Sequence, residues 1–229
     1  MATTLPATYA ATRAALHAVA EHVLSPALHR ATGRIGLRPT PGGFGTPWFP
    51  AGDGARHARI EGTDLVVADR DGGERRAPLR TVGEAAALLG VEPGAPADVY
   101  PPVTTIDPDA HLALDPYAAQ VIHDWFDLTG RALDELRREF AALDPSIAQL
   151  WPEHFDLAIS MAEVNYGGSP GDDGHDAPYL YVGPWDLDGR VGPYWNEPFG
   201  ASLGHQAVRT VDDALAFFST GRRLASVPR

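Results

Sequence analysis

Residues 115–143 restrict the fold of this chain more than any other segment, because their apolar residues follow a helical period. The mean step between them is about 3.7 residues, close to the 3.6 of an α-helix, and they are Val121, Trp125, Leu128, Ala132, Leu136, Phe140 and Leu143. On the opposite side stand two acid-to-base pairs four residues apart, Asp127 with Arg131 and Asp134 with Arg138. Asp115-Pro116 is typical of a helix start. We therefore predict one long amphipathic helix whose buried face the rest of the chain must cover.

The residues before this helix predict a helix, a meander of short strands and a second helix. Apolar spacing indicates a helix over Ala7 to Leu24, with a short second piece that ends near Gly33. Alternation and turn residues predict strands at 35–40, 57–61, 65–68 and 74–79, and the glycine-rich run 41–47 predicts a loop. Thr81 with Glu84 three residues later predicts a capped helix that ends at Gly90.

The residues after the long helix predict the same order of elements. A strand is expected over Phe155 to Met161, and a glycine-rich loop over Asn165 to Asp172. A further strand is expected at 179–182, and Asp188-Gly189 predicts a hairpin leading to Tyr194-Trp195. Thr210 then caps a closing helix.

These patterns predict an α+β fold of two similar halves, each an antiparallel meander packed on a long helix and closed by a shorter one. Residues 1–91 form the first half, 92–114 a linker with five prolines, and 115–229 the second half, in one compact body. The repeated order, with Arg80-Thr-Val and Arg209-Thr-Val at the two closing helices, indicates an internal duplication, to which coincidence is the alternative.

Two residue types are missing from the chain, and their absence excludes several chemistries. The sequence contains no cysteine, and all 18 of its basic residues are arginine. Thiolate nucleophiles, disulfides and thiolate metal sites are therefore excluded. Schiff-base enzymes and nucleotide-binding lysines are excluded as well.

The net charge of −12 belongs to the second part of the chain. Residues 1–100 hold 10 arginines and 10 acids, whereas residues 101–229 hold 8 arginines and 20 acids. An acidic surface repels phosphate backbones and anionic lipids, so we expect neither a nucleic-acid partner nor a membrane. With no signal-peptide layout at the start, we expect a cytoplasmic protein of unassigned oligomeric state.

Aromatic and polar residues concentrate between residues 151 and 199, which makes this stretch the candidate binding site. Its aromatic residues are Trp151, Phe155, Tyr166, Tyr179, Tyr181, Trp185, Tyr194, Trp195 and Phe199. Its polar residues are Glu153, His154, Asp156, Glu163, Asn165, Asp172, Asp173, His175, Asn196 and Glu197. Small-molecule sites are usually apolar pockets with a few convergent polar groups, although the same aromatics would also suit a packed core. We expect Trp151, Asn165, Tyr166, Tyr179, Tyr181, Trp185, Trp195 and Asn196 to bind the ligand.

His154 and Asp156 are the candidate catalytic pair, with Glu153 beside them. On a strand, residues two apart face the same side, so this imidazole and carboxylate would project together. They suit either a histidine base oriented by a carboxylate or two ligands of Zn²⁺ or Mn²⁺, with His175 or His205 as the third. An ordinary hydrogen-bonded pair at a sheet edge is the alternative. A divalent metal is the only cofactor that these residues suggest.

The first helix carries a pattern close to a zinc-protease motif. His17, Glu21 and His22 read H-x-x-x-E-H, whereas the two known zinc-protease motifs are H-E-x-x-H and H-x-x-E-H. Because the spacing does not match, we interpret His17 and Glu21 as an exposed pair four residues apart.

Several runs resemble a family of uncharacterised proteins common in high-GC bacteria. They are Leu150-Trp-Pro-Glu-His-Phe-Asp-Leu157, Asn165-Tyr-Gly-Gly-Ser-Pro-Gly-Asp172, Pro178-Tyr-Leu-Tyr-Val-Gly-Pro-Trp185, Tyr194-Trp-Asn196 with Pro198-Phe-Gly-Ala201, and Gly33-Arg-Ile-Gly-Leu37 with Pro41-Gly-Gly-Phe-Gly45. A second family of unknown function is distantly similar through its Trp-x-x-Phe-Asp-Leu-Ala pattern. The resemblance covers most of the chain and implies one natural unit, but no catalytic residue.

Three functions are consistent with the sequence. The first is a small-molecule-binding protein with an aromatic-lined pocket in the second half. The second is an enzyme independent of cysteine and lysine, a hydrolase or isomerase that uses a metal or a histidine with a carboxylate. The third is an acidic interaction module, in which exposed tryptophans would form a partner surface.

Overall fold

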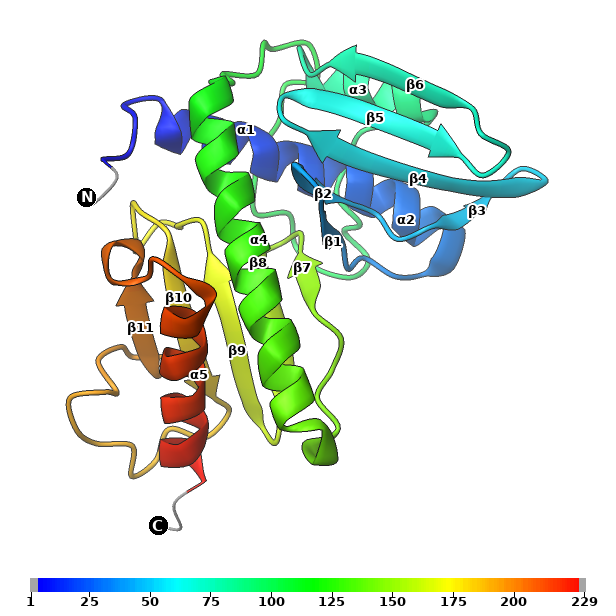
Figure 1. The fold of residues 1–229 in the computed structure, drawn as a ribbon. Helices are drawn as coiled ribbons and strands as arrows, with labels where there is room; N and C mark the ends of the chain where they lie inside the picture. The colour runs from blue at the N-terminus through cyan, green and yellow to red at the C-terminus, as the bar shows by residue number, and fades with distance from the viewer. Residues whose placement is uncertain (1–3, 227–229) are drawn as a thin grey trace. The chain divides into compact units, whose positions relative to one another are not determined.

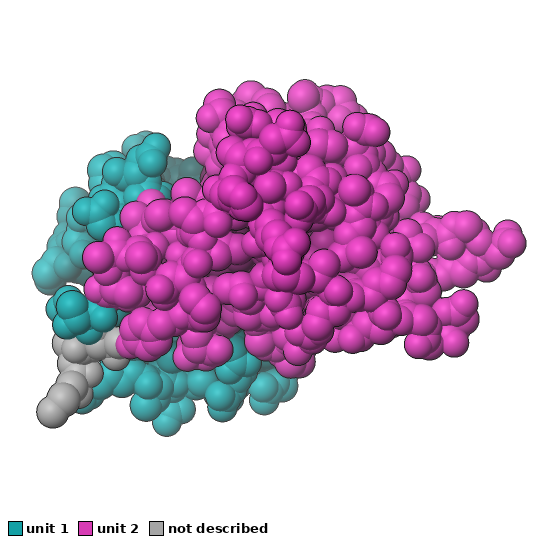
Figure 2. Space-filling view, turned by 90° about the horizontal axis from the view of Figure 1, so that it is seen from above, with its two compact units in different colours: residues 1–4, 125–149, 156–229 teal, residues 5–124, 150–155 magenta. Residues whose placement is uncertain are grey.

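The computed structural model describes residues 4–226 as an α+β protein with two antiparallel sheets and helices packed on them (Figure 1). Contacts divide it into two compact units, coloured separately in Figure 2. The N-terminal unit is Leu5–Asp124 with Leu150–Phe155, and the C-terminal unit consists mainly of residues 125–149 and 156–226. Within residues 4–226, no helix has both the length and the apolar character that a bilayer span requires.

The N-terminal unit begins with two α-helices joined by a π-helical turn. These are α1 (Tyr9–Val19), the π-turn η1 (Ala20–Leu24) and α2 (Ser25–Thr32), which ends at Gly33 in the left-handed conformation. The predicted helix is therefore confirmed, but it continues into α2 through the π-turn without a side-chain cap. All five residues of the π-turn are buried. π-Helical turns are rare in proteins. They occur mostly as single turns inside α-helices, and frequently at functional sites.

The sheet of this unit has the strand order β1-β2-β4-β5-β6, and β3 also pairs with β4. Its strands are β1 (Arg38–Thr40), β2 (Gly43–Gly45), β3 (Phe49–Ala51), β4 (Gly54–Glu61), β5 (Asp64–Asp69) and β6 (Glu74–Pro78). Helices α1, α2 and α3 (Val82–Leu89) lie behind the sheet in Figure 1. Thr81 caps α3 by accepting a hydrogen bond from the Glu84 N–H, as predicted.

The prediction of a loop at residues 41–47 was wrong, because Gly43–Gly45 is strand β2. A Cβ atom at Gly43 would lie 2.0 Å from the Ile60 carbonyl oxygen, and one at Gly45 would lie 2.4 Å from that of Ala58. Only glycine allows β4 to approach this closely. The glycines that indicated a loop are therefore what the strand pairing requires.

One face of this sheet carries a network of ion pairs across strands. Arg59 pairs with Glu61 and Glu74, at 3.1 and 3.3 Å. Arg76 pairs with Glu61 at 2.7 Å and with Asp64 at 3.0 Å. Arg59 and Glu61 lie on β4, Asp64 on β5, and Glu74 and Arg76 on β6, so the network connects three strands and neutralises part of the charge of the first hundred residues.

Glu21 is the charged group around which the N-terminal unit is organised. Its side chain is fully buried, so the predicted exposed pair with His17 was wrong. Glu21 Oε1 accepts from the Val103 N–H at 2.8 Å, and Oε2 accepts from the N–H and hydroxyl of Thr104. Burial alone would raise the pKa of Glu21, but hydrogen bonds from His22, Thr104 and Val103 outweigh it and lower the pKa to about 2.

The proline-rich segment 92–114, predicted as a linker, is bound to the helices by hydrogen bonds. The Gly94 N–H donates to the His22 carbonyl at 3.0 Å, in addition to the bonds that Glu21 accepts. Near its end, the Thr12 hydroxyl donates to the Ala113 carbonyl and accepts from the Asp115 N–H. A segment without helix or strand is thus held by side chains of α1 and the π-turn.

Helix α4 (Pro116–Glu139) is the predicted long helix, and it begins in the N-terminal unit and continues in the C-terminal unit. Asp115 caps it by accepting from the Ala118 N–H at 2.8 Å. The pair Asp127–Arg131 is present at 3.8 Å, whereas Asp134 pairs with Arg137 instead of Arg138. The buried face of the helix differs from the predicted one, since Leu143 is exposed. The fully buried side chains of α4 include Ile122, Phe126, Thr129, Leu133 and Leu136.

His123 is a second buried titratable group of the N-terminal unit. It is 3% exposed, and no described residue provides a hydrogen-bond partner for either ring nitrogen. Its ring contacts the edge of Phe44, with centroids 6.3 Å apart. Burial lowers the pKa of His123 to about 4.

The C-terminal unit has one sheet face covered by helices. The strand order is β11-β10-β9-β8-β7, from β7 (Gln149–Trp151), β8 (Asp156–Met161), β9 (Val164–Ser169), β10 (Tyr179–Pro184) and β11 (Ala201–Gly204). Of β7, only Gln149 is counted with the C-terminal unit. Short 3-10 turns occupy Ala141–Leu143 and His205–Ala207. Helix α5 (Val211–Ala225) lies in front of β9 and β10 in Figure 1, where Phe218 meets the edge of Tyr166. Thr210 caps this helix as predicted, and together with Asp213 it forms a complete capping box.

Two predictions in this unit were wrong. The glycine-rich run 165–172 was predicted as a loop, but β9 extends to Ser169. Its Gly168 lies against Thr129 of α4, where a Cβ atom would be 2.6 Å from the hydroxyl oxygen. Asp188-Gly189 forms a turn, yet the strand that follows is Ala201–Gly204 and not Tyr194-Trp195.

Replacing the buried Glu21 carboxylate tests its role in stability. We expect Glu21→Gln to lower the free energy of unfolding by about 3 kcal/mol at pH 7, because buried N–H groups lose a charged acceptor. In the wild type the low pKa stabilises the fold above pH 4.5, and this contribution of about 3 kcal/mol is lost as the pH falls towards 2. Urea unfolding between pH 7 and 2 measures both effects. The exposed Glu92→Gln is the matched control, and equal stability of the two variants would contradict the prediction.

Protonation of the buried His123 predicts a second loss of stability on acidification, at pH values above those at which Glu21 becomes protonated. Its folded pKa of about 4 lies below the ordinary 6.5, so the unfolded chain binds the proton first. The fold should lose about 3 kcal/mol as the pH falls from 6.5 to 4. Unfolding curves of His123→Leu should lack this loss, whereas the exposed His111→Leu should keep it. Parallel pH profiles for wild type and His123→Leu would disprove the assignment.

Candidate functional site

The face of the second sheet opposite α4 and α5 carries polar side chains. Strand register places Asp156 beside Ser169 and Tyr179, and Ala158 beside Gly167, Tyr181 and Ser202. The other face carries apolar residues such as Leu157, Tyr166 and Val182. Asp156, Ser169 and Tyr179 are themselves buried, although they lie on the polar face. Buried polar groups of this kind require hydrogen-bond partners.

Tyr181 and Asp156 form the first hydrogen-bonded pair of the site. The Tyr181 hydroxyl on β10 donates to Asp156 Oδ2 on β8, across the intervening strand β9. Gly167 on β9 makes this reach possible, because a Cβ atom there would lie 2.6 Å from the Tyr181 hydroxyl and ring. Burial, followed by the charge of Asp156, raises the pKa of Tyr181 well above its ordinary value.

Tyr179 and Asp172 form a second pair of the same kind. The Tyr179 hydroxyl donates to Asp172 Oδ2, while Asp172 Oδ1 accepts from the N–H groups of Gly174 and His175. Burial alone would raise the pKa of Asp172, but these three donors outweigh it and lower the pKa. Burial and the Asp172 carboxylate raise the pKa of Tyr179. Both phenols therefore stay protonated as donors at physiological pH.

His175 lies between two carboxylates. Its Nε2 is 3.1 Å from Glu197 Oε1, and its Nδ1 is 3.4 Å from Asp172 Oδ1. The Ser202 hydroxyl donates to the same Glu197 oxygen at 2.7 Å, and this bond and that of His175 lower the pKa of Glu197. The imidazole is 28% exposed, so solvent reaches it. Carboxylates on both nitrogens orient an imidazole for proton transfer or charge pairing.

Three further ring contacts complete an aromatic cluster, which we call the acidic aromatic cluster together with Asp156, Asp172, His175 and Glu197. The rings of Tyr179, Tyr181 and Phe199 have centroid distances of 6.3 to 6.4 Å from one another. His175 stacks on Tyr179 at 4.1 Å. Phe199 is 38% exposed, so this ring of the cluster faces solvent, whereas Tyr179 and Asp156 are buried.

The predicted catalytic pair does not share a strand face. His154 is exposed in a turn over residues 152–155, where Phe155 has a φ of +51°, and β8 begins only at Asp156. The predicted alternation is absent, since both neighbours of Leu157 are buried. Among the residues that the structure describes, no three or more histidine or acidic side chains form a metal-binding group, so the set His154, Asp156 and His175 has no geometric support. Glu153 lies in the same turn as His154, in the N-terminal unit.

The predicted ligand-binding residues occupy several different environments. Tyr179 and Tyr181 belong to the cluster, whereas Tyr166 is fully buried in the helix-covered core. Asn165 accepts hydrogen bonds from Ser160 and from the indole of Trp185, which is 65% exposed. The Asn196 side-chain oxygen accepts a hydrogen bond from the Ser202 N–H. Trp195 packs against Tyr194 and Arg190, and Trp151 lies in the N-terminal unit.

Sequence reasoning missed Ser169 and Ser202 as partners of the cluster. The sequence could have indicated Ser202 only if the pairing of β10 with β11 had been known. The turn at Asp172 carries a recognisable signal, since an aspartate that accepts from main-chain N–H groups two and three residues later is a common turn former.

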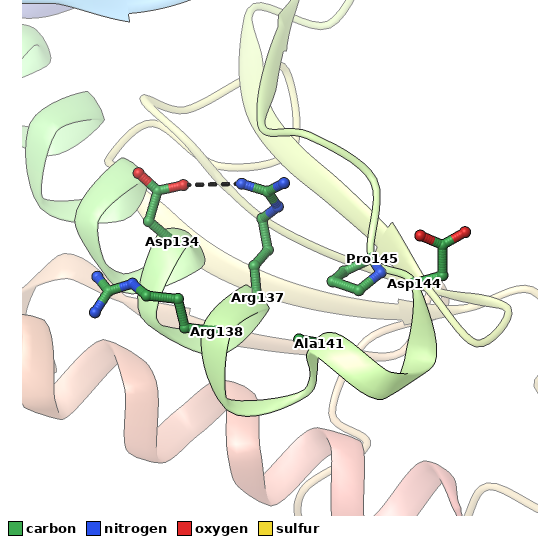
Figure 3. Close-up of a pocket in the computed structure, with 6 residues that line it drawn as sticks. All are labelled: Asp134, Arg137, Arg138, Ala141, Asp144 and Pro145. Atoms are coloured by element: carbon green, nitrogen blue, oxygen red, sulfur yellow. Dashed lines mark hydrogen bonds and ion pairs between the residues drawn. The ribbon is translucent and has the colours of Figure 1, made fainter.

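A separate hollow of about 500 Å³ lies at the end of α4 and is lined by charged side chains (Figure 3). Asp134 and Arg137 point toward each other there, with a bond of 3.3 Å. Arg137 and Arg138 occupy the last turn of the helix, where cations favourably oppose the helix dipole. The hollow is wide open and its polar groups have this structural explanation, so the acidic aromatic cluster is the better candidate site.

Comparison with known proteins found no matching family model, curated protein or solved structure. The resemblance to families of unknown function in the sequence therefore stays a prediction.

Removing one phenol hydroxyl tests the coupling within the cluster. We expect Tyr181→Phe to lower the free energy of unfolding by about 1–3 kcal/mol, because the buried Asp156 loses a hydroxyl donor. Chemical denaturation measures this difference. The exposed Tyr117→Phe removes the same atom from the surface and should have little effect. A Tyr181→Phe variant as stable as Tyr117→Phe would show that the bond contributes nothing.

Proposed function

We propose that this chain is a small-molecule-binding protein and that its acidic aromatic cluster binds an organic cation. The observation that carries the proposal is the placement of three carboxylates around the rings of Tyr179, Tyr181 and Phe199. Aromatic faces attract cations, and quaternary ammonium groups are the ligands that such rings recognise in proteins.

The charges of the cluster support a cation over an anion. The basic group that pairs with both Asp172 and Glu197 is an imidazole, His175, which carries at most one positive charge. The surrounding chain from residue 101 onward holds 20 acids against 8 arginines. A surface field of this sign raises the local concentration of cations and repels phosphates and carboxylates.

The exposure of the cluster suggests how a ligand would reach it. Phe199 is 38% exposed and the Asp172 side chain 41%, whereas Tyr179 and Asp156 lie beneath them. A cation would contact Phe199 and the carboxylates of Asp172 and Glu197 first. The buried phenol–carboxylate pairs would hold the rings in position from below.

We also infer that the two halves of the chain are related by duplication. Each contains a helix, an antiparallel meander and a threonine-capped closing helix. The capping residues Thr81 and Thr210 have nearly the same backbone angles, with φ of −136° and −138° and ψ of 161° and 164°. The similar sequences before both caps support the same inference.

Choline and its neutral isostere 3,3-dimethylbutan-1-ol test the binding proposal. The two probes have nearly the same shape, so tighter binding of choline measures the attraction of the site for charge. We expect choline to bind at least about tenfold more tightly, because a cation over aromatic rings beside carboxylates gains about 1.4 kcal/mol or more. Calorimetric titration and chemical shifts of Phe199 and His175 report the binding.

The variants Glu197→Gln and Phe199→Ala should each weaken choline binding without unfolding the protein. Glu163→Gln removes the same charge from an exposed residue of the same unit and should leave binding unchanged. Equal affinities for choline and the neutral alcohol, or no binding of either, would refute the proposal.

A further inference from the structure

The π-turn of the N-terminal unit places two successive ionisable residues in the interior. Glu21 is fully buried and His22 is 5% exposed. The π-turn also leaves the His22 carbonyl oxygen to accept a hydrogen bond from the Gly94 N–H outside the helix. A buried π-turn with paired charged residues is a costly arrangement that frequently marks a functional site.

The hydrogen bonds that Glu21 and His22 already make determine which of their atoms remain available to bind another group. Glu21 uses both oxygens on the segment 103–104, as described above. His22 Nε2 lies 3.0 Å from the Thr104 carbonyl oxygen, which only accepts, so Nε2 carries the proton and donates. In the neutral ring, Nδ1 is then an acceptor, and among residues 4–226 it has no hydrogen-bond partner.

Three other buried oxygens lie near this pair: Ser25 Oγ, Tyr100 Oη and Glu153 Oε2. The hydroxyls of Ser25 and Tyr100 are hydrogen-bonded to each other, and Glu153 Oε2 has no hydrogen-bond partner in the described part of the chain. Ser25 is fully buried and lies one helical turn after His22. The Tyr100 hydroxyl lies beside Ser25 and is influenced by the carboxylates of both Glu21 and Glu153.

The turn that carries Glu153 is held against the same helix. The His17 Nε2 atom lies 2.8 Å from the Pro152 carbonyl oxygen, and the His17 ring stacks on Phe155 at 5.2 Å. His17 precedes Glu21 by four residues, so it faces the same side of the helix. We call Glu21, His22, Ser25, Tyr100 and Glu153 the π-turn cluster. The turn that carries Glu153 is held by His17 of α1, and the segment that follows Tyr100 is held by Glu21 of the π-turn.

We propose that the π-turn cluster is a second binding site, which takes an ammonium ion or the protonated end of a primary amine. His22 Nδ1, Glu153 Oε2 and the hydroxyl oxygens of Ser25 and Tyr100 all have lone pairs that can accept hydrogen bonds, and an ammonium group presents three or four donors in a tetrahedral arrangement. Glu21 and Glu153 supply negative charge to balance the cation, with His22 as the neighbouring base. Burial of the charge is favourable only when it is both paired and hydrogen-bonded, which this set of atoms provides.

The chemistry of the cluster argues against other ligands. An anion would meet two carboxylates, and a transition metal would require at least three strong ligands, which the described histidine and acidic residues do not assemble. The inference does not depend on the proposed function, because it concerns different residues in the other unit.

Ammonium labelled with ¹⁵N is the direct probe of this site. A bound ion that is protected from exchange should give its own ¹H–¹⁵N resonance, with nuclear Overhauser effects to the Tyr100 ring. We expect Glu153→Gln and Tyr100→Phe to abolish this resonance or weaken binding by about tenfold or more, since each removes an interaction with a charged group. The exposed Glu92→Gln, in the same unit, should keep the resonance.

Thermal unfolding in ammonium chloride and in sodium chloride of the same ionic strength provides the second readout. Ammonium should raise the melting temperature of the wild type more than sodium does, and the difference should disappear in Tyr100→Phe, which retains the aromatic ring. The proposal is overturned if the wild type shows only free ammonium in the spectrum, or if sodium reproduces the whole shift. A resonance that persists in Tyr100→Phe and Glu153→Gln would place the ion elsewhere and equally overturn it.

Discussion

The buried carboxylate of Glu21 is the interaction on which the organisation of the N-terminal unit depends. The segment 92–114 has no helix or strand to satisfy its main-chain groups, so side chains must do so. Glu21 accepts two of these N–H groups, and Thr12 bonds the end of the same segment. Because the proline-rich segment leads directly to the cap of α4, its attachment also determines where the long helix begins.

A second constraint, common to both sheets, is close approach through glycine. Gly43 and Gly45 let β4 lie against β2, and Gly167 lets the Tyr181 ring cross β9 to reach Asp156. In the first case glycine shapes the fold, and in the second it shapes the candidate site. In both cases a strand stands where glycine content indicates a loop.

Local signals predicted the helices well, because capping and helical periodicity depend on residues close in the sequence. The starts of α3, α4 and α5 follow from Thr81, Asp115 and Thr210, whose side chains bond N–H groups within their own first turns. The pairing of strands could not be predicted in the same way, since it depends on residues distant in the chain. The same limit applies to the site: the residues between 151 and 199 were recognised as a group, but their division between Tyr166 in the core and Tyr179 in the cluster depends on strand register.

The first part of the chain is neutral and the second part is negative because the side chains that lie beside the acidic residues differ between the two sheets. In the first sheet, acids lie beside arginines of the same or other strands, and Glu61 is neutralised by Arg59 of β4 and Arg76 of β6. At the second sheet, Asp156 of β8 and Asp172 of the segment between β9 and β10 lie next to tyrosines, whose hydroxyls donate a hydrogen bond but bring no charge. A phenol satisfies the lone pairs of a carboxylate and leaves its negative charge uncompensated. The second sheet therefore retains a field that a cation can use, and the absence of lysine throughout the chain leaves no flexible ammonium group to fill that place from within.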